Sequence, residues 1–505
     1  MKKLLSLALA GLLTFSVGVS CQKSADINGA LVNGKYDISK INIPTYTTDQ
    51  TLDITAYAGP TTANYAGSVD TINEYHYQKL AEAGFNKVLA LYEGNGGKRD
   101  SDPYQWIKNR SEAAKKPAMR SLAEAEKFDV KYYVRDWTFY GLYKELHQTF
   151  GLPKTREVYE RVIKDMFSEE NPYIYSPAYG GNFAADEPTI QELEQIAWQV
   201  EFYNKYVREE KGIDAEPMIN LYPAYVSSGG LSSSGYVTYE EYIDRYFELI
   251  APMVGYVSYD YYPFVKEQYE GSYMKTSYLY NLELMATKCK ETRDSQTPVE
   301  LRTFMQSVGD FTGLRSMSNI GDFRIQIYSA LAFGSKEIIY YKYIDEKMHD
   351  ADSDWGLLSY MTGEYTWGYD CAKTVNNEVK AFADAYLNFD WEGTLYNNAN
   401  PMIDNANFKY LRYASTSHPR IGKFTSTEDA LMTYMKDKDG NDAFMLVNFT
   451  DPYFEKDNEV TIQFKNTKAL LMYRLGQKVV VPLGKDGTYT FKLYPGEGRF
   501  IIPLK

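Results

Sequence analysis

The sequence contains little cysteine and little histidine. Its 505 residues include three cysteines and four histidines, and no two histidines stand in an HxH or HxxxH spacing. The cysteines Cys21, Cys289 and Cys371 lie far apart in the chain. A disulfide framework needs several paired cysteines, and a zinc centre needs clustered Cys or His ligands. The composition therefore argues against both, and we expect neither a metal ion nor another cofactor.

Positive charge is also scarce. Asp and Glu outnumber Lys and Arg, the net charge is −13, and no basic stripe is present. Nucleic-acid binding depends on such a stripe, so we expect no nucleic-acid partner. The apolar stretch near the start, residues 4–19, is shorter than the roughly 20 residues that cross a bilayer. Contact with a membrane is therefore expected only through a lipid anchor.

The first 21 residues have the pattern of an export signal. Lys2 and Lys3 precede the apolar stretch, and Ser20 and Cys21 follow it. A charged start, a short apolar region and small residues before a cleavage point are typical of a secretory signal. The ending resembles a bacterial lipobox, which implies that Cys21 is lipidated. We expect a signal over 1–21, a polar tether over 22–45, and a protein of the cell envelope; plain secretion is the alternative.

Aromatic side chains are abundant. They make up 15% of the chain, and 48 residues are tyrosine. Such side chains present a flat apolar face with a polar edge, which suits the stacking of sugar rings. A tyrosine-rich core is the alternative explanation.

Short apolar segments alternate with amphipathic segments over most of the chain. Eight segments are expected to be strands: Leu52–Ala58, Phe85–Tyr92, Val130–Trp137, Gly181–Ala185, Pro217–Tyr222, Gly255–Tyr262, Val299–Gln306 and Glu337–Tyr343. Helical patterns lie between them: Ile72–Ala83, Ser121–Lys127, Thr155–Phe167, Ile190–Lys211, Tyr239–Ala251, Tyr273–Thr292 and Asp322–Phe333. Eight such units predict an α/β fold, a (β/α)8 TIM barrel, over residues 46–389.

The alternation of apolar and amphipathic segments ends after the eighth expected strand. One more helix is expected at Asn376–Leu387, and only short alternating runs follow, such as Ala443–Phe449 and Glu459–Phe464. The pairs Asp439-Gly440 and Asp486-Gly487 are hairpin signals. Residues 390–505 are therefore predicted to form an all-β sandwich.

The active site of a barrel lies at the carboxyl ends of its strands. The fourth expected strand ends in Asp186-Glu187-Pro188. Two adjacent carboxyls repel each other, which raises one pKa, and a carboxyl that keeps its proton can serve as a general acid. The alternative is that this tripeptide caps the helix expected from Ile190.

Other strand ends carry further acidic and aromatic side chains. Hydrolysis of a glycosidic bond needs a second carboxyl and platforms for the sugar rings. We expect Glu187, Asp260 and Asp186 to be catalytic, although Asp260 can instead be read as a turn residue. The expected substrate-binding residues are Glu93, Asp136, Trp137, Tyr222, Tyr261, Tyr262, Gln306 and Lys342.

These motifs resemble a known group. The Asp-Glu-Pro motif looks like that of barrel glycoside hydrolases common in polysaccharide-degrading gut Bacteroidetes, which are similar in plan to family 42. Further segments carry the resemblance: Ser258–Phe264, Asp322–Tyr343, Trp355–Leu358, Val447-Asn448 and Pro495–Gly498. It implies that Glu187 is the acid/base and that the substrate is a carbohydrate. Asp186 stands where relatives have Asn, and Gln306 stands where they have the nucleophilic Glu.

The departure at Gln306 leaves two readings open. The chain is expected to be an exported glycoside hydrolase acting on a poly- or oligosaccharide, or a catalytically inactive glycan-binding lipoprotein on the same scaffold. The sixth-strand Tyr259-Asp260 is also similar to chitinase-like family 18 enzymes, in which the N-acetyl group of the substrate is the nucleophile. The fourth-strand carboxylate ladder of that family is absent.

Overall fold

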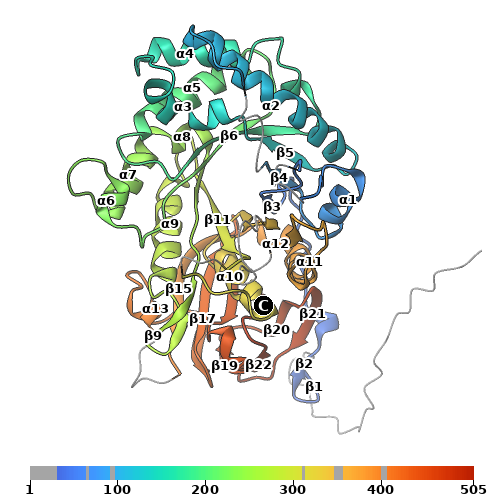
Figure 1. Cartoon of the computed structure of the whole chain (residues 1–505). Helices are drawn as coiled ribbons and strands as arrows, with labels where there is room; N and C mark the ends of the chain where they lie inside the picture. The colour runs from blue at the N-terminus through green and yellow to red at the C-terminus, as the bar shows by residue number, and fades with distance from the viewer. Residues whose placement is uncertain (1–30, 64–67, 91–96, 310–312, 346–355, 400–405) are drawn as a thin grey trace, which may run out of the picture.

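The computed structural model describes residues 31–63, 68–90, 97–309, 313–345, 356–399 and 406–505. Eight parallel strands form one sheet in the order β7-β6-β5-β4-β3-β12-β11-β8 (Figure 1). A bridge between Leu221 and Tyr259 joins the two outer strands and closes the barrel. The strands are β3 (Asp53–Tyr57), β4 (Lys87–Leu89), β5 (Lys131–Val134), β6 (Tyr179–Asp186), β7 (Glu216–Asn220), β8 (Tyr256–Tyr259), β11 (Glu300–Gln306) and β12 (Glu337–Tyr341). The predicted barrel and its eight strand positions are confirmed.

Most of the helices surround the barrel, and a few short ones lie beside the C-terminal part. They are α1 (Glu74–Glu82), α2 (Pro103–Glu126), α3 (Trp137–Gln148), α4 (Arg156–Met166), α5 (Leu193–Tyr203), α6 (Ser228–Leu231), α7 (Tyr239–Leu249), α8 (Ala251–Val254), α9 (Tyr278–Thr292), α10 (Ile320–Ala332), α11 (Trp367–Lys380), α12 (Ala383–Tyr386) and α13 (Ala406–Lys409), with short turns η1 (Ile38–Lys40), η2 (Tyr173–Tyr175), η3 (Asn204–Glu209) and η4 (Pro452–Phe454). In α7 the side chain of Thr238 accepts from the backbone of Glu241, whose carboxylate bonds back to Thr238. This reciprocal cap fixes the start of the helix.

Helix α3 was not predicted, and α2 begins 18 residues before its expected start. Asp136 caps α3 with its side chain, so β5 ends at Val134 and not at Trp137 as expected. The sequence signal of α2 is weakened by the internal Pro117, which removes one backbone donor. Pro103 at its first turn is well placed, because the amide there has no partner in a helix.

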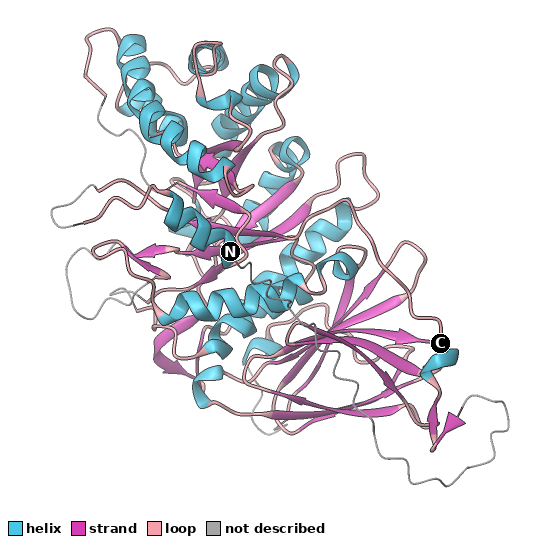
Figure 2. Ribbon diagram, turned by 90° about the vertical axis from the view of Figure 1, so that its right-hand side faces the viewer, coloured by secondary structure: helices cyan, strands magenta, loops and turns pink. Residues whose placement is uncertain are grey.

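The C-terminal part is a β-sandwich, which Figure 2 shows as the strand-rich lower region. One sheet has the order β15-β17-β18-β23-β20-β21, and the other β16-β19-β22. The strands are β15 (Asp390–Asn397), β16 (Ile421–Ser426), β17 (Ala430–Lys436), β18 (Asp442–Asn448), β19 (Asn458–Phe464), β20 (Ala469–Arg474), β21 (Gln477–Pro482), β22 (Thr488–Leu493) and β23 (Gly498–Leu504). Asp439-Gly440 forms the predicted hairpin between β17 and β18. The hairpin predicted at Asp486-Gly487 is wrong, since β21 and β22 belong to different sheets.

Short elements complete the described chain. They are β1 (Leu31–Val32), β2 (Lys35–Tyr36), β9 (Phe264–Tyr269), β10 (Ser272–Met274), β13 (Ile344–Asp345) and β14 (Leu358–Ser359). The β1–β2 hairpin lies in the segment expected to be a tether, and the amide of Tyr36 donates to the carbonyl of Leu483 at 3.0 Å. The expected signal and Cys21 lie outside the described residues. Within the described ranges, no helix has the length and apolarity to cross a membrane.

Candidate active site

Three carboxyl groups gather at the carboxyl ends of neighbouring barrel strands. Asp186 ends β6, Glu187 follows it, and Asp260 directly follows β8. Between them lies Asn220, the last residue of β7. Its side-chain nitrogen donates to Asp186 Oδ1 at 3.2 Å and to Asp260 Oδ1 at 3.1 Å. The two aspartates predicted from strands four and six therefore share one hydrogen-bond donor.

A bulge in β6 aims Asp186 into the barrel. Phe183 pairs with Met218 and Ala185 with Ile219, so the residue between Phe183 and Ala185 is extra. Phe183 points inward, because its ring lies 6.0 Å from the ring of Tyr57 on β3. In a regular strand Asp186, three residues later, would face the opposite way. The inserted residue reverses the alternation, and the carboxyl of Asp186 accepts a hydrogen bond from Tyr57 as well.

Glu187 has a left-handed backbone conformation with φ of 47°. Its amide donates to the carbonyl of Asn220 at 2.9 Å, which holds this turn against β7. A non-glycine residue in this region is uncommon and strained. Helix α5 begins only at Leu193, with Glu192 in the cap position, so the alternative that Asp186-Glu187 caps this helix is wrong.

The electrostatic environment favours a proton on Glu187. Burial, the charge of Asp260 and the charge of Asp186 raise its pKa to about 9. Burial and the charge of Asp186 raise the pKa of Asp260 to about 7, against the hydrogen bonds from Asn220 and Tyr262. Burial also raises the pKa of Asp186, against the charge of Arg135. At neutral pH the cluster thus combines a protonated Glu187 with two aspartates that share the side-chain amide of Asn220 as a hydrogen-bond donor.

Cationic and phenolic groups surround the acidic cluster. The guanidinium of Arg135 lies 4.3 Å from the ring centre of Tyr140 and 5.0 Å from that of Trp137. Its charge and that of Lys144 on α3 act on Asp186. Arg135 is 8% exposed, so the cation is held against the rings and not released to solvent. At the mouth of the barrel, the negative charge of the carboxyl groups is therefore partly neutralised by Arg135 and Lys144, and aromatic side chains line one side.

Three of the predicted binding residues lie at this mouth. Burial and the charge of Glu187 raise the pKa of Tyr222 to about 12, which places its phenol beside the cluster. Tyr262 bonds to Asp260, and its ring lies 4.8 Å from that of Tyr341 at the end of β12. Trp137 stacks on Arg135 and is half-buried.

Three other predicted binding residues serve the fold. Gln306 is fully buried, accepts from the amide of Phe264, and donates to the carbonyls of Val308 and Arg315. Asp136 is fully buried as the cap of α3 and also accepts from Ser111. Tyr261 is buried against Tyr225 and Tyr278, and its hydroxyl bonds Ser277. In each case backbone or core partners use the polar atoms that a sugar would need.

Two predicted binding residues remain, Lys342 and Glu93. Lys342 directly follows β12 and is half-buried, and its carbonyl accepts from Ser307. Its contact with substrate stays a prediction. Glu93 lies outside the described residues. The sequence analysis did not assign three residues of the site: Asn220, Arg135 and Tyr57. Each ends or directly follows a barrel strand, and this position is the signal that could have identified them.

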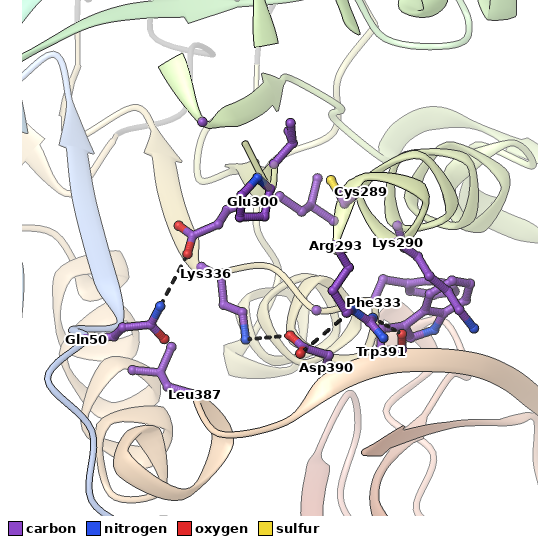
Figure 3. A pocket seen from close by; sticks show the side chains of 16 residues that line it. Gln50, Cys289, Lys290, Arg293, Glu300, Phe333, Lys336, Leu387, Asp390 and Trp391 are labelled. Carbon is purple, nitrogen blue, oxygen red and sulfur yellow. Dashed lines mark hydrogen bonds and ion pairs between the residues drawn. The ribbon is translucent and has the colours of Figure 1, made fainter. Parts of the chain in front are cut away.

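A cavity lies at the opposite end of the barrel from the acidic cluster (Figure 3). It has a volume of about 480 Å³ and is lined by Glu300, which begins β11, and by Lys336, which precedes β12. Its cations have partners: Lys336 donates to the carbonyl of Phe389, and Arg293 pairs with Glu392 at 2.5 Å. The cavity lies where the barrel meets the sandwich strand β15, so its groups tie the two parts together. The acidic cluster of Asp186, Glu187 and Asp260 lies at the other end of the barrel.

No group of three or more His, Cys, Asp or Glu side chains in the described ranges is arranged to hold a metal ion. No protein-family model and no curated protein matches the chain. Among solved structures, a glycoside hydrolase is similar with a TM-score of 0.51 and 12% identity, over 90% of this chain and 92% of that one. A family 5 glycoside hydrolase from Bacteroides vulgatus ATCC 8482 has a TM-score of 0.49 and 12% identity, over 92% and 89%. At such identity the first likeness supports the barrel fold, and the activity must be argued from the site.

Proposed function

We propose that this protein is a glycoside hydrolase in which Glu187 is the general acid. One observation carries the proposal: the carboxyl of Glu187 lies at the barrel mouth beside two aspartates, in surroundings that keep it protonated. A protonated carboxyl can give its proton to the glycosidic oxygen as the bond to the anomeric carbon breaks. Tyr222, Tyr262 and Trp137 provide surfaces on which sugar rings can stack.

Asp260 is our first candidate for the second catalytic group, and Asp186 is the alternative. With a pKa of about 7, Asp260 is partly ionised at neutral pH. As a carboxylate it either takes a proton from water, which then attacks the anomeric carbon, or attacks that carbon itself. The first course inverts the configuration and the second retains it.

The experiment compares Glu187→Gln with the wild type on a panel of oligosaccharides and aryl glycosides. We expect Glu187→Gln to lower kcat/KM by about 100-fold or more, because the amide cannot donate a proton of comparable acidity. The loss should be smaller on dinitrophenyl glycosides, whose leaving group needs little protonation. Glu194→Gln, the same change at an exposed position of α5, is the control. Unchanged hydrolysis by Glu187→Gln with the wild-type fold would refute the assignment.

A glycan-binding protein without activity is the second candidate. It is favoured by Gln306, which stands at the end of β11 and bonds only backbone groups in the contacts described above. The barrel glycoside hydrolases that this chain resembles carry the nucleophilic Glu at this strand end. A glycan array run beside the hydrolysis panel separates the candidates, since binding without product supports this one.

We further propose that the protein is exported and anchored to the cell envelope through a lipid on Cys21. The lysines, apolar stretch and Ser20-Cys21 ending of the first 21 residues support this proposal. Metabolic labelling with a radioactive fatty acid should mark the wild type and not Cys21→Ser. Equal labelling of both proteins would contradict the anchor.

A further inference from the structure

Asn220 touches all three acidic residues of the candidate site. Strand β7 lies between β6 and β8 in the barrel, so its last side chain reaches Asp186 on one side and Asp260 on the other. Its main-chain carbonyl accepts the amide of Glu187 at 2.9 Å. Asn220 is 2% exposed, so water does not compete freely for these bonds.

The chemistry of the amide suits this place. Two carboxylates on the strands at either side of β7 repel each other, and a shared neutral donor opposes that repulsion without adding a charge of its own. One nitrogen contacts an oxygen of each, so the two oxygens can be no farther apart than the sum of the two hydrogen bonds. The amide oxygen faces Ser258 at 3.4 Å, which orients the nitrogen toward the carboxylates and not away from them.

We propose that Asn220 is a positioning residue of the reaction assigned above, one that sets the spacing of Asp186 and Asp260 and fixes the backbone turn of Glu187. It transfers no proton and does not attack the substrate. Its role is to hold the carboxylates in a working geometry and to favour their ionised forms. This inference rests on the proposed function, but its effect on the aspartates can be measured without any substrate.

The test replaces Asn220 by Asp, which has nearly the same shape. An aspartate lacks the donor nitrogen and adds a negative charge, so the pKa of Asp260 should rise by about one unit or more. The other charged and titratable groups around the aspartates stay as they are: Tyr57, Arg135, Tyr140, Lys144, Glu187, Tyr222, Tyr239 and Tyr262. Carbon-13 NMR of protein labelled at the aspartate carboxyls measures the shift, and Asp260→Asn assigns the signal.

In hydrolysis, the acid limb of the pH profile of kcat should move to higher pH by the same amount. We expect kcat at neutral pH to fall about tenfold to a hundredfold, as for the loss of hydrogen bonds to charged groups, with KM changed much less. Asn220→Ala removes the donor without adding charge, so it should lower kcat with a smaller shift of the limb. It serves as the second variant if the buried aspartate prevents folding.

Asn182→Asp is the matched control. Asn182 is a fully buried asparagine of the neighbouring strand β6, and its side chain bonds the phenols of Tyr179 and Tyr173. This variant should change stability and leave the acid limb and the Asp260 signal in place. If Asn220→Asp and Asn220→Ala keep the wild-type limb and signal, the positioning role is wrong. A wild type that hydrolyses no glycoside overturns the proposed function, while the NMR shift still decides the role of Asn220.

Discussion

A single side chain at the site is expected to reduce the stability of the fold. The pKa of Glu187 is about 9 in the folded protein, against an ordinary value of 4.5. Between these values the folded protein keeps a proton that the unfolded chain releases. The free energy of unfolding must therefore fall as pH rises from about 4.5 toward about 9. Functional sites often hold groups whose removal stabilises the protein.

Glu187→Gln should remove this penalty. The amide cannot ionise, so at pH 8 we expect the variant to be more stable than the wild type by roughly 1–3 kcal/mol. At pH 4, where Glu187 is protonated in both states, the difference should vanish. Urea unfolding of both proteins at the two pH values measures it, with Glu194→Gln as an exposed control. A variant that gains nothing at pH 8 would show that Glu187 is ionised in the folded protein.

The sequence was informative about which residues end strands and less so about where their side chains point. Asp186, Glu187 and Asp260 were found because each follows a short apolar run. Gln306 and Asp136 hold the same kind of position, yet their polar atoms bond a loop and a helix cap. Those partners are distant or local backbone groups, whose placement no periodicity reveals. The inward turn of Asp186 depends on the bulge in β6, which leaves no mark in the hydrophobic pattern.

At the scale of elements, the strands are joined at their starts by a largely buried layer of charged side chains. Arg302 on β11 donates to both oxygens of Glu216 on β7, at 2.6 and 2.9 Å. Lys87 on β4 lies 2.8 Å from Asp53 and 3.3 Å from Glu337. Burial would raise the pKa of Glu216, but Arg302 and Lys87 lower it to about 2. This layer lies at the end of the barrel opposite the site.

Arg302→Met should destabilise the protein by about 3–5 kcal/mol, because it leaves two carboxylates buried without this partner. Glu216 has a lowered pKa, so its contribution is complete above about pH 4.5 and is lost as pH falls toward about 2. The variant should therefore differ most from the wild type at neutral pH and least in acid. Urea unfolding across this range tests it. Arg245→Met, which breaks an exposed pair with Glu248, should cost less than about 1 kcal/mol, and equal losses would contradict the argument.

At the scale of the whole molecule, the hydrophobic core of the barrel continues onto one face of the larger sandwich sheet, while a second core lies inside the sandwich. Helix α10 lies between the barrel and the sandwich (Figure 1). The hydroxyl of Thr433 on β17 donates to the carbonyl of Ala332 at 2.6 Å. Phe382 stacks on Phe500 of β23 with ring centres 5.5 Å apart. The change from alternating strands and helices to strands alone predicted a barrel and a sandwich. It did not predict that the two pack against each other, because hydrophobic periodicity shows which face of an element is apolar and not which element covers it.

A chain ending at residue 389 should therefore fail to fold independently. Loss of the sandwich would expose the sheet-facing side of α10 and the ring of Phe382 to water, and large exposed apolar patches favour aggregation. We expect residues 46–505 to unfold in one cooperative transition and residues 46–389 to be insoluble or to bind a hydrophobic dye. Circular dichroism and size-exclusion chromatography compare them. A soluble 46–389 fragment with barrel-like dichroism would show that the barrel carries its own stability, and that the proposed boundary at residue 390 divides independent domains.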